Sequence, residues 1–375
     1  MNCMNHSQSA AQVLRLALAD GVGAKTYAAL VEHFGSPEAV STCSAGVLQS
    51  VRGVGPKTAA AIADVSESDV EEELAISTEA GAAVICFGDE RYPAALKTIP
   101  NPPPVIWVRG EMSPEDVSSI GVVGSRRCSH YGMEQAERFG GLLARAGLTV
   151  ISGGARGIDT AAHRGALRTG GRTVAVMGCG LGHVYPPENA DLFEEIVAEG
   201  RGALVSELPM RTAVLSGNFP MRNRIISGMS LGTLVVEAAL PSGALITARE
   251  AAEQGRDVFA VPGRVDSPTS AGTLQLLRDG ACLVADLDDI LNGLGDVGEA
   301  FQPDGEPAPE IAPTPQDLPP RQAVLYSLLA EGGLRLDELV ARSEISPGDV
   351  ASEMTMLVLR GLVAQSPGNR FDRKR

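Results

Sequence analysis

Several patterns that define common protein classes are missing from this sequence of 375 residues. The six cysteines include no CxxC pair and the five histidines form no HExxH or HxxxH cluster, so neither a zinc site nor a disulfide framework is expected. No run approaches the ~18–20 apolar residues of a membrane-spanning helix, and the N-terminus has no basic stretch followed by an apolar core. We therefore expect a cytoplasmic protein with no membrane anchor, metal ion or cofactor.

Aromatic residues are also scarce, with one Trp, five Tyr and eight Phe. A protein that holds single-stranded nucleic acid mainly by stacking many bases is therefore not expected. Glycine is abundant by contrast, at 43 of 375 residues against a usual ~7%, which predicts many tight turns and close backbone approaches. The hydrophobic fraction of 44% excludes wholesale disorder, and the length predicts two or three domains.

The net charge is strongly negative, since 31 Lys and Arg face 46 Asp and Glu, and 31 − 46 = −15. This balance argues at first sight against a nucleic-acid partner. The charge is unevenly distributed, however: residues 1–120 contribute 7 − 15 = −8, 121–230 contribute 12 − 9 = +3, 231–320 contribute 4 − 15 = −11 and 321–375 contribute 8 − 7 = +1. All twelve basic residues of the positive segment are arginine. Any nucleic acid should therefore be held locally, while much of the remaining surface repels it or faces protein partners.

A repeat marks the N-terminal part of the chain, where residues 21–30 read GVGAKTYAAL and residues 53–62 read GVGPKTAAAI. The glycines permit a tight hairpin, and the free amides of the following helix lie beside Lys25 or Lys57, which is a natural seat for a phosphate. We predict a pair of helix-hairpin-helix (SAM-like) units over residues 1–80. Because this part of the chain is acidic, a helical interaction domain that keeps the hairpins for packing alone is an equally open interpretation.

Farther along the chain, apolar segments alternate with helical patterns. Unbroken apolar strands between helices are typical of a parallel sheet covered on both faces, whose ligands bind at the carboxyl ends of the strands. We predict an extended Rossmann-like α/β domain over residues 81–292, which begins with short strands at 83–89 and 105–110. The other expected strands are 120–124, 149–153, 173–178, 203–207, 233–239, 257–262 and 282–286, and the expected helices are 131–146, 157–169, 189–199 and 244–255.

The C-terminal part begins with a segment rich in proline, glycine and acids at 293–320, which predicts a flexible linker. Three short helical patterns and a strand pair follow over 321–375, in the order of a winged-helix domain. The third helix reads the groove in DNA-binding members of this class. Only one of the residues that this helix offers is basic, so DNA reading and protein interaction both remain open. The residues are Glu353, Met354, Thr355 and the basic Arg360.

Three loops at the carboxyl ends of expected strands carry the candidate functional residues. The first, VVGSRRCSHYG at 122–132, exposes backbone amides beside two guanidinium groups that can bind phosphate. The second, SGGARGIDTAAH at 152–163, has a glycine pair, an arginine and Gly157 at an expected helix start. The third, GNFPMRNRIISGMS at 217–230, presents one phenylalanine and two arginines on an expected short turn around Pro220. Their meeting at one sheet edge predicts a binding site.

Structural interpretations of these loops stay open. Asp159 and His163 lie four residues apart on an expected helix, and we expect them to bond each other rather than to form a catalytic dyad. Ser125 as a nucleophile has no convincing base. The first loop also lacks a GxGxxG pattern and an acid for an adenosine ribose. Purely structural roles in packing or in bracing loops are open for Gly124, Gly153, Phe219 and Arg224.

The ordered motifs over roughly residues 120–281 closely resemble those of the DNA-processing protein A (DprA, also called Smf) family, as do the helix-hairpin-helix and winged-helix segments around them. The motifs are VVGSRRCSHYG, SGGARGIDTAAHRGAL, GCGLGHVYPPEN, NFPMRNRIISGMS, EAALPSGALITAREAAEQGRDVFAVPG and AGTLQLLRDGA. This resemblance implies a protein that binds single-stranded DNA and is not an enzyme. It implies protection of incoming strands in natural transformation, loading of the RecA recombinase, and a homodimer formed through the Rossmann domain.

The resemblance also implies which residues bind the strand. Some family members have a lysine three residues before the phenylalanine, where Ser216 stands here, and Arg211 could compensate for that missing charge. The resemblance carries over eight residues, and five neighbours from the same loops complete the predicted single-stranded DNA site. The eight are Gly124, Ser125, Arg126, Phe219, Arg222, Asn223, Ser242 and Gly243, and the five are Arg127, Gly154, Arg156, Gly157 and Arg224.

A nucleotide hydrolase of the lysine-decarboxylase-like Rossmann group is the alternative, because it shares a similar glycine-rich sheet edge. Its PGGxGT signature with a catalytic glutamate is missing, since VPGRVDSP has only one glycine at the corresponding place. A third interpretation, an interaction hub whose acidic faces and winged helix bind protein partners, is compatible with DNA binding.

Overall fold

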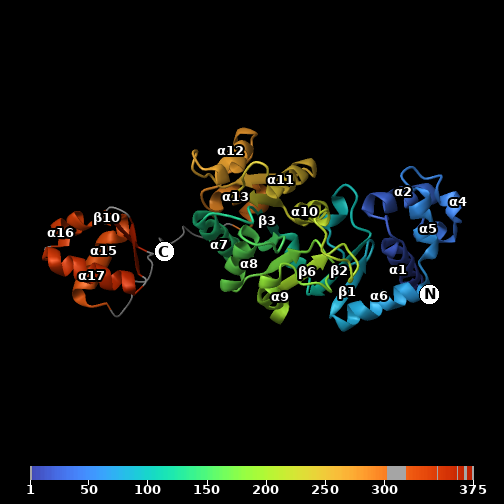
Figure 1. Cartoon of the computed structure of the whole chain (residues 1–375), viewed down its shortest axis with the longest axis horizontal. Coiled ribbons are helices and arrows are strands. Elements are labelled where there is room, and N and C mark those ends of the chain that lie inside the picture. The colour runs from blue at the N-terminus through green and yellow to red at the C-terminus, as the bar shows by residue number, and fades with distance from the viewer. Residues whose placement is uncertain (1, 302–317, 344, 361, 367–369, 374–375) are drawn as a thin grey trace. The chain divides into compact units, whose positions relative to one another are not determined.

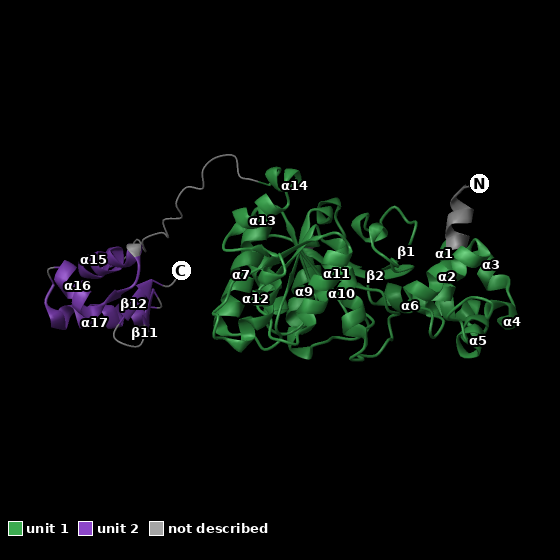
Figure 2. Cartoon of the chain, turned by 90° about the horizontal axis from the view of Figure 1, so that it is seen from above, with its two compact units in different colours: residues 1–302 green, residues 303–375 purple. Residues whose placement is uncertain are grey.

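The computed structural model describes residues 2–301, 318–343, 345–360, 362–366 and 370–373 (Figure 1). The chain divides into two compact units, residues 1–302 and 303–375 (Figure 2). The first contains the N-terminal helices together with the large sheet, and the second contains the small C-terminal domain.

A nine-stranded sheet in the order β1-β2-β6-β5-β4-β3-β7-β8-β9 forms the centre of the first unit. From β6 to β9 all neighbouring strands are parallel, whereas β2 is antiparallel to both β1 and β6. The α/β prediction is thus confirmed, with an antiparallel extension at one edge. The strands are β1 Ala82–Cys86, β2 Val105–Gly110, β3 Ser119–Val123, β4 Thr149–Ser152, β5 Thr173–Val176, β6 Gly202–Ser206, β7 Gly232–Val235, β8 Asp257–Ala260 and β9 Cys282–Leu283.

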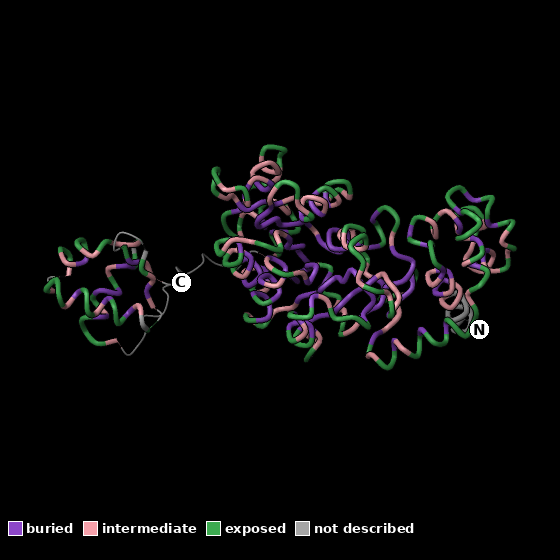
Figure 3. Tube along the Cα trace, in the orientation of Figure 1, coloured by how far each residue is buried: buried purple, intermediate pink, exposed green. Residues whose placement is uncertain are grey.

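Helices cover both faces of the sheet, which is why its strands are apolar without alternation. Adjacent strand residues face opposite sides: Val122 packs with Phe139 and Ile158 on one face, and Val123 packs with Ile225 on the other. Figure 3 shows the resulting buried band along the strands. The helices of this region are α7 His130–Arg145, α8 Ile158–Arg168, α9 Ala190–Val197, α10 Asn218–Met229, α11 Gly243–Glu253, α12 Ala271–Arg278, α13 Leu287–Gly293 and α14 Asp296–Glu299.

Six N-terminal helices precede the sheet. Both repeats fold as expected, since Gly23 and Gly55 are the residues before α2 and α5. Lys57 pairs with Asp20 at 3.4 Å on the surface. The six helices are α1 Asn2–Leu18, α2 Ala24–Phe34, α3 Pro37–Thr42, α4 Ala45–Leu48, α5 Pro56–Asp64 and α6 Glu67–Glu79.

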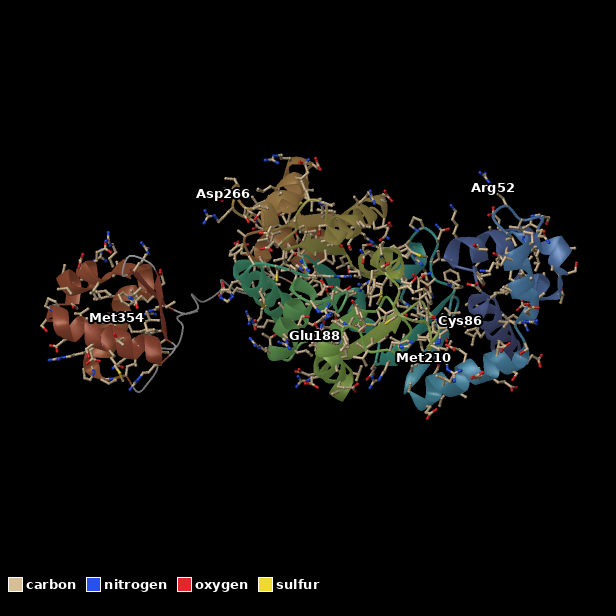
Figure 4. The ribbon with its side chains drawn as sticks, in the orientation of Figure 1. Arg52, Cys86, Glu188, Met210, Asp266 and Met354 are labelled. Atoms are coloured by element: carbon tan, nitrogen blue, oxygen red, sulfur yellow. The ribbon has the colours of Figure 1, made fainter. Side chains whose placement is uncertain are left out.

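These helices are joined to the sheet domain through a shared core. Leu14 of α1 packs in one cluster with Cys86 and Met210, which Figure 4 labels at this junction. Glu73 of α6 is buried, and its Oε1 accepts a hydrogen bond from the Met210 amide at 2.7 Å. The segment predicted as a separate domain over 1–80 is therefore part of the same compact unit.

The predicted linker at 293–320 differs from the structure at both ends. Asp296–Glu299 forms α14, and Phe301 packs against the core beside α13. Helix α15 already begins at Pro320. Residues 302–317, the middle of the predicted linker, lie outside the described residues.

The second unit has the predicted winged-helix order. Its three-stranded sheet has the order β10-β12-β11. Met354, a candidate for reading DNA, is instead buried in the core of this unit (Figure 4), because α17 turns that position inward. Glu353 accepts a hydrogen bond from the Gln322 side chain at 2.7 Å, whereas Thr355 and Arg360 are exposed. The elements are α15 Pro320–Leu328, β10 Leu334–Arg335, α16 Leu336–Ser343, α17 Pro347–Leu359, β11 Val363–Ser366 and β12 Arg370–Arg373.

Short 3₁₀ turns connect several of these elements. They are η1 Ala95–Thr98, η2 Pro114–Val117, η3 Pro187–Asn189, η4 Ala198–Gly200, η5 Pro268–Ser270 and η6 Leu329–Glu331.

Candidate functional site

A cavity of about 700 Å³ opens at the carboxyl ends of β3, β4 and β7, between these strand ends and α10. The three predicted loops therefore do meet at one sheet edge. Nine of the thirteen predicted residues line this cavity: Gly124, Ser125, Arg126, Arg127, Phe219, Arg222, Asn223, Ser242 and Gly243. Ser216, at the place of the expected lysine, also lines it.

The loop after β3 is held by its backbone, which leaves its arginines free to face the cavity. The Ser125 amide donates to the Glu237 carbonyl at 2.8 Å, and the Ser125 hydroxyl accepts from the Arg127 amide at 3.1 Å. A Cβ at Gly124 would lie 2.5 Å from Ile158, so this glycine is required for packing. The side chains of Arg126 and Arg127 are exposed. This rigid turn presents two cations to the cavity.

Glu237, which the sequence reasoning missed, fixes the end of this loop. Its carboxylate is buried, accepts from the Ser129 amide at 2.9 Å and also accepts from the Ser129 hydroxyl. Ser129 in turn caps α7 by accepting from the Gly132 amide. A lone acid in the apolar run TLVVEAA was the signal that could have identified Glu237, because a buried carboxylate needs partners.

An aromatic pair forms the next wall of the cavity. The Arg126 guanidinium lies 5.0 Å from the centroid of the half-buried Phe219 ring. The Tyr185 ring also neighbours the Phe219 ring: the two ring centroids are 5.6 Å apart and the interplanar angle is 46°. Stacking of arginine on an aromatic ring fixes its plane and leaves its edge available for hydrogen bonds. Tyr185 was not predicted, although the YPP sequence within the resembling motif contains it.

The third loop is helical, so the predicted short turn around Pro220 is wrong. Helix α10 starts at Asn218, and Pro220 lies within its first turn, where backbone amides have no partner within the helix. Asn223 then faces the start of α11 and donates to the Gly243 carbonyl at 3.3 Å. Ser242 caps α11 by accepting from the Ala244 amide at 3.3 Å.

Arg222 forms part of the cavity floor and is only 4% exposed. Its Nη1 donates to the Val176 carbonyl, and the guanidinium fills the place that a side chain at Gly153 would take. Burial lowers the pKa of Arg222 to about 10, although the carboxylate of Asp159 nearby acts in the opposite direction. The group remains charged at neutral pH, and its main contacts are inside the protein.

Asp159 and His163 do not bond each other, contrary to the prediction. Asp159 accepts from the amides of Gly153 at 3.1 Å and Ala155 at 3.3 Å, which closes the turn after β4. His163 Nδ1 instead bonds the Thr173 hydroxyl on β5 at 2.6 Å. Helical spacing brought the two residues onto neighbouring positions, but backbone and strand partners compete successfully for both.

Burial lowers the pKa of His163 to about 3, from 6.5 when it is exposed. The unfolded chain therefore binds a proton at this site between pH 6.5 and pH 3 that the folded chain excludes. The stability that depends on neutral His163 is complete above pH 6.5 and falls as the pH drops toward 3, by at most ~1.4 kcal/mol per pH unit. We expect this one group to lower the unfolding free energy by about 2 kcal/mol from pH 7 to pH 5.

The variant His163→Gln isolates this effect, because glutamine can bond Thr173 without titrating. Urea unfolding at pH 7 and pH 5, followed through the fluorescence of the single, fully buried Trp107, gives the pH dependence of both proteins. The wild type should lose about 2 kcal/mol more than the variant over this range. An equal loss in both proteins would contradict a neutral His163.

The remaining predicted residues lie outside the main cavity. Gly154, at φ +62°, packs against Phe193, and Gly157, at φ +78°, packs against the backbone of the loop after β3. Arg224 forms an ion pair with Glu207, with both side chains largely buried. Arg156 pairs with Glu188. Arg211, which could compensate for the missing lysine, does not line the cavity and pairs with Glu72 at 2.5 Å.

The chemistry of the cavity is that of an anion and base site. It combines exposed guanidinium groups, loop and helix-start backbone, and an aromatic ring, which suit phosphate and a planar base. In the part of the chain that the structure describes, no group of three or more His, Cys, Asp or Glu side chains is placed to hold a metal ion. The described helices include none that is both long and apolar enough to span a membrane.

Comparison with known proteins gives consistent matches along the chain. A family model described as DNA recombination-mediator protein A matches residues 83–295, the DprA winged helix domain matches 306–369, and a SAM-like helix-hairpin-helix tandem matches 13–72. The helix-hairpin-helix and winged-helix predictions are thus confirmed.

Similar curated proteins include Protein Smf of Escherichia coli, at 38% identity over 80% of this chain and 79% of the relative. Protein Smf of Synechocystis is 36% identical over 76% of this chain and 79% of the relative. Among solved structures, DNA processing protein A from Streptococcus pneumoniae matches with a TM-score of 0.66 at 31% identity, covering 76% of this chain and 97% of that chain. DNA processing protein A from Helicobacter pylori, reported for its single-stranded DNA binding mode, matches with a TM-score of 0.51 at 27% identity, covering 57% and 95%.

Proposed function

The chain belongs to the DNA recombination-mediator protein A family, and on that premise we propose that its sheet-edge cavity binds single-stranded DNA without reading its sequence. The observation that carries this proposal is the stack of Arg126 on Phe219 beside the exposed Arg127, at the mouth of a cavity of about 700 Å³. A Helicobacter pylori relative of the same fold is reported to bind single-stranded DNA, which supports the assignment.

The contacts available at the cavity favour backbone over base recognition. Guanidinium groups and loop amides bind phosphates irrespective of sequence. A base stacked on Phe219 contributes ~1–3 kcal/mol whatever its identity, because every base has a π face. Since one aromatic ring and two exposed arginines carry the site, the affinity should depend strongly on salt and weakly on sequence.

We propose further that the bound strand is protected and passed to the RecA recombinase, in the cytoplasm, by a homodimer that assembles through the sheet domain. These finer points are supported by the resemblance of the six motifs to the family, and the match to a recombination-mediator model agrees with them. Protein partners would also explain the acidic remainder of the surface, which would face them rather than DNA.

The role proposed for the site is binding rather than catalysis. The Ser125 hydroxyl accepts from the Arg127 amide, and His163 is buried against Thr173, so each has a structural partner. The nucleotide-hydrolase alternative makes a different prediction: incubation with nucleoside monophosphates should release free base. Such release would overturn the binding-only assignment.

A salt titration of oligo-dT binding tests the proposed function directly. With two to three phosphates neutralised, the logarithm of the binding constant should fall against the logarithm of salt with a slope of about −1.4 to −2.1. Oligo-dC should bind with similar affinity, and a blunt duplex more weakly. A chain truncated before residue 302 should retain this behaviour if the cavity is the main contact. Failure of the full chain to bind any single strand would contradict the proposal.

A further inference from the structure

A second, much narrower recess adjoins the main cavity. The two share four lining residues, Arg126, Ala155, Tyr185 and Phe219, and the recess continues along Arg156 and Pro186. Its volume of about 10 Å³ is that of roughly one water molecule, so a base does not fit inside it. The recess instead marks a continuous surface that runs from Phe219 past Tyr185 to Arg156.

The guanidinium of Arg156, at the end of this surface, is paired with the carboxylate of Glu188. Its Nε and Nη2 donate to the two carboxylate oxygens of Glu188, the second at 3.0 Å. The hydrogen bond to Glu188 raises the pKa of Arg156 and lowers that of Glu188, so both groups are charged at neutral pH. Tyr185 and Arg156 line the same recess, so the ion pair adjoins the aromatic wall.

This ion pair is a weak one that an incoming anion can replace. About half of each side chain is exposed, at 48% and 50%, and exposed ion pairs contribute little to stability because water screens them. A phosphate offers the guanidinium the same two-oxygen geometry as the carboxylate. An acidic side chain beside a site for a polyanion weakens binding. Because Glu188 occupies the guanidinium of Arg156, a phosphate has to replace Glu188 before it can bind there.

The backbone around Glu188 allows its side chain alone to move. The neighbouring Asn189 is 3% exposed, and its side-chain amide donates to the Gly154 carbonyl at 3.0 Å and to the Thr160 hydroxyl at 2.8 Å. These bonds hold the segment before α9 against the loop that carries Arg156. Glu188, labelled in Figure 4, projects from this anchored segment to the surface.

We propose that single-stranded DNA leaves the main cavity over Tyr185 and that its next phosphate displaces the Glu188 carboxylate from Arg156. This inference rests on the proposed function and extends its site by one phosphate. Glu188 then acts as a built-in competitor: a strand that fills only the cavity leaves the ion pair intact, and a longer strand has to replace it. Tyr185 becomes a second surface on which a base can stack.

The variant Glu188→Gln tests this inference, because it removes the competing charge and keeps the shape. Oligo-dT of about twelve nucleotides should bind about two- to fivefold tighter at low salt, while oligo-dT of about four nucleotides should bind as before. The gain should vanish in the double variant Arg156→Ala/Glu188→Gln. Arg156→Ala alone should weaken binding of the longer strand only.

Glu195→Gln is the matched control. Glu195 pairs with Arg201 at 3.4 Å just before β6, at the amino ends of the parallel strands and thus opposite the cavity. Equal tightening by both glutamine variants would reveal a general charge effect and overturn the inference, as would unchanged or weaker binding by Glu188→Gln. If the wild type then still binds oligo-dT and Arg126→Ala binds it more weakly, the proposed function stands. A wild type that binds no oligo-dT would contradict both the inference and the proposed function. Melting curves of each variant exclude misfolding as the cause.

Discussion

Replacing Arg126 with alanine should weaken binding of oligo-dT by roughly 10- to 100-fold, the largest loss expected from any exposed residue of the cavity. The change removes a phosphate-binding guanidinium and also the cation that lies 5.0 Å from the Phe219 ring. Charge-assisted hydrogen bonds contribute ~1.5–3 kcal/mol, and removal of one such donor gives this range. The affinity is measured by fluorescence anisotropy at a fixed, stated salt concentration.

Phe219→Ala should cost a similar ~1–3 kcal/mol by removing the stacking surface. Because Arg126 and Phe219 are in contact, the double variant should lose less than the sum of the two single losses. Arg126→Lys should fall in between, since it keeps the charge but lacks the planar group that stacks on the ring.

Arg168→Ala supplies the control for Arg126→Ala. Arg168 is 69% exposed at the end of α8, near the amino ends of the strands, so the change removes one positive charge from the edge opposite the cavity. It should leave the affinity within about twofold. Equal losses from both variants would show that net charge, rather than the sheet-edge cavity, governs binding.

Much of the sheet could be predicted from the sequence because both of its faces are covered. A strand buried on both sides must be apolar at every position, so runs such as 173–178 and 203–207 identified their strands within about two residues. The meeting of the three loops followed from the same topology, since the carboxyl ends of parallel strands share one edge. The prediction of the cavity rested on this rule more than on any single residue.

The local contacts of side chains could not be predicted in the same way. Arg222 and Arg224 lie two residues apart in one motif. Arg222 is buried under the cavity, whereas Arg224 pairs with Glu207. Neither side chain is exposed, and the partner of each depends on the face that α10 presents. The turn expected around Pro220 concealed that helix. Asp159 and His163 have the right spacing to bond, but their partners come from a loop and a strand that spacing does not encode.

The uneven charge along the chain becomes concrete in the structure. The cavity loops belong to the one net-positive stretch of the α/β domain, while several of the other arginines there are already paired with acids such as Glu188, Glu207 and Glu72. Arginine content alone therefore overstates the charge available to DNA. Arg126 and Arg127 are the cations that the cavity itself exposes, and they should account for most of the salt dependence.

Replacing Arg222 with alanine should destabilise the first unit by about 3–5 kcal/mol, the largest stability effect expected in the molecule. The substitution takes from the buried Asp159 one of its two positive neighbours and removes the donor to the Val176 carbonyl. It also leaves a void beside Gly153, where the guanidinium now packs. Each of these losses affects a buried group, for which the loss of a partner costs more than it does at the surface.

Thermal and urea unfolding followed through Trp107 report this effect cleanly, because the only tryptophan is buried in β2 of the same unit. The double variant Arg222→Met/Asp159→Asn should recover part of the lost stability, since it removes the unpaired charge and fills some of the volume. Arg126→Ala, by contrast, should melt like the wild type. If Arg222→Ala instead melts like the wild type and loses only affinity for oligo-dT, then Arg222 contacts the strand directly. That result would contradict a stabilising role for its buried guanidinium.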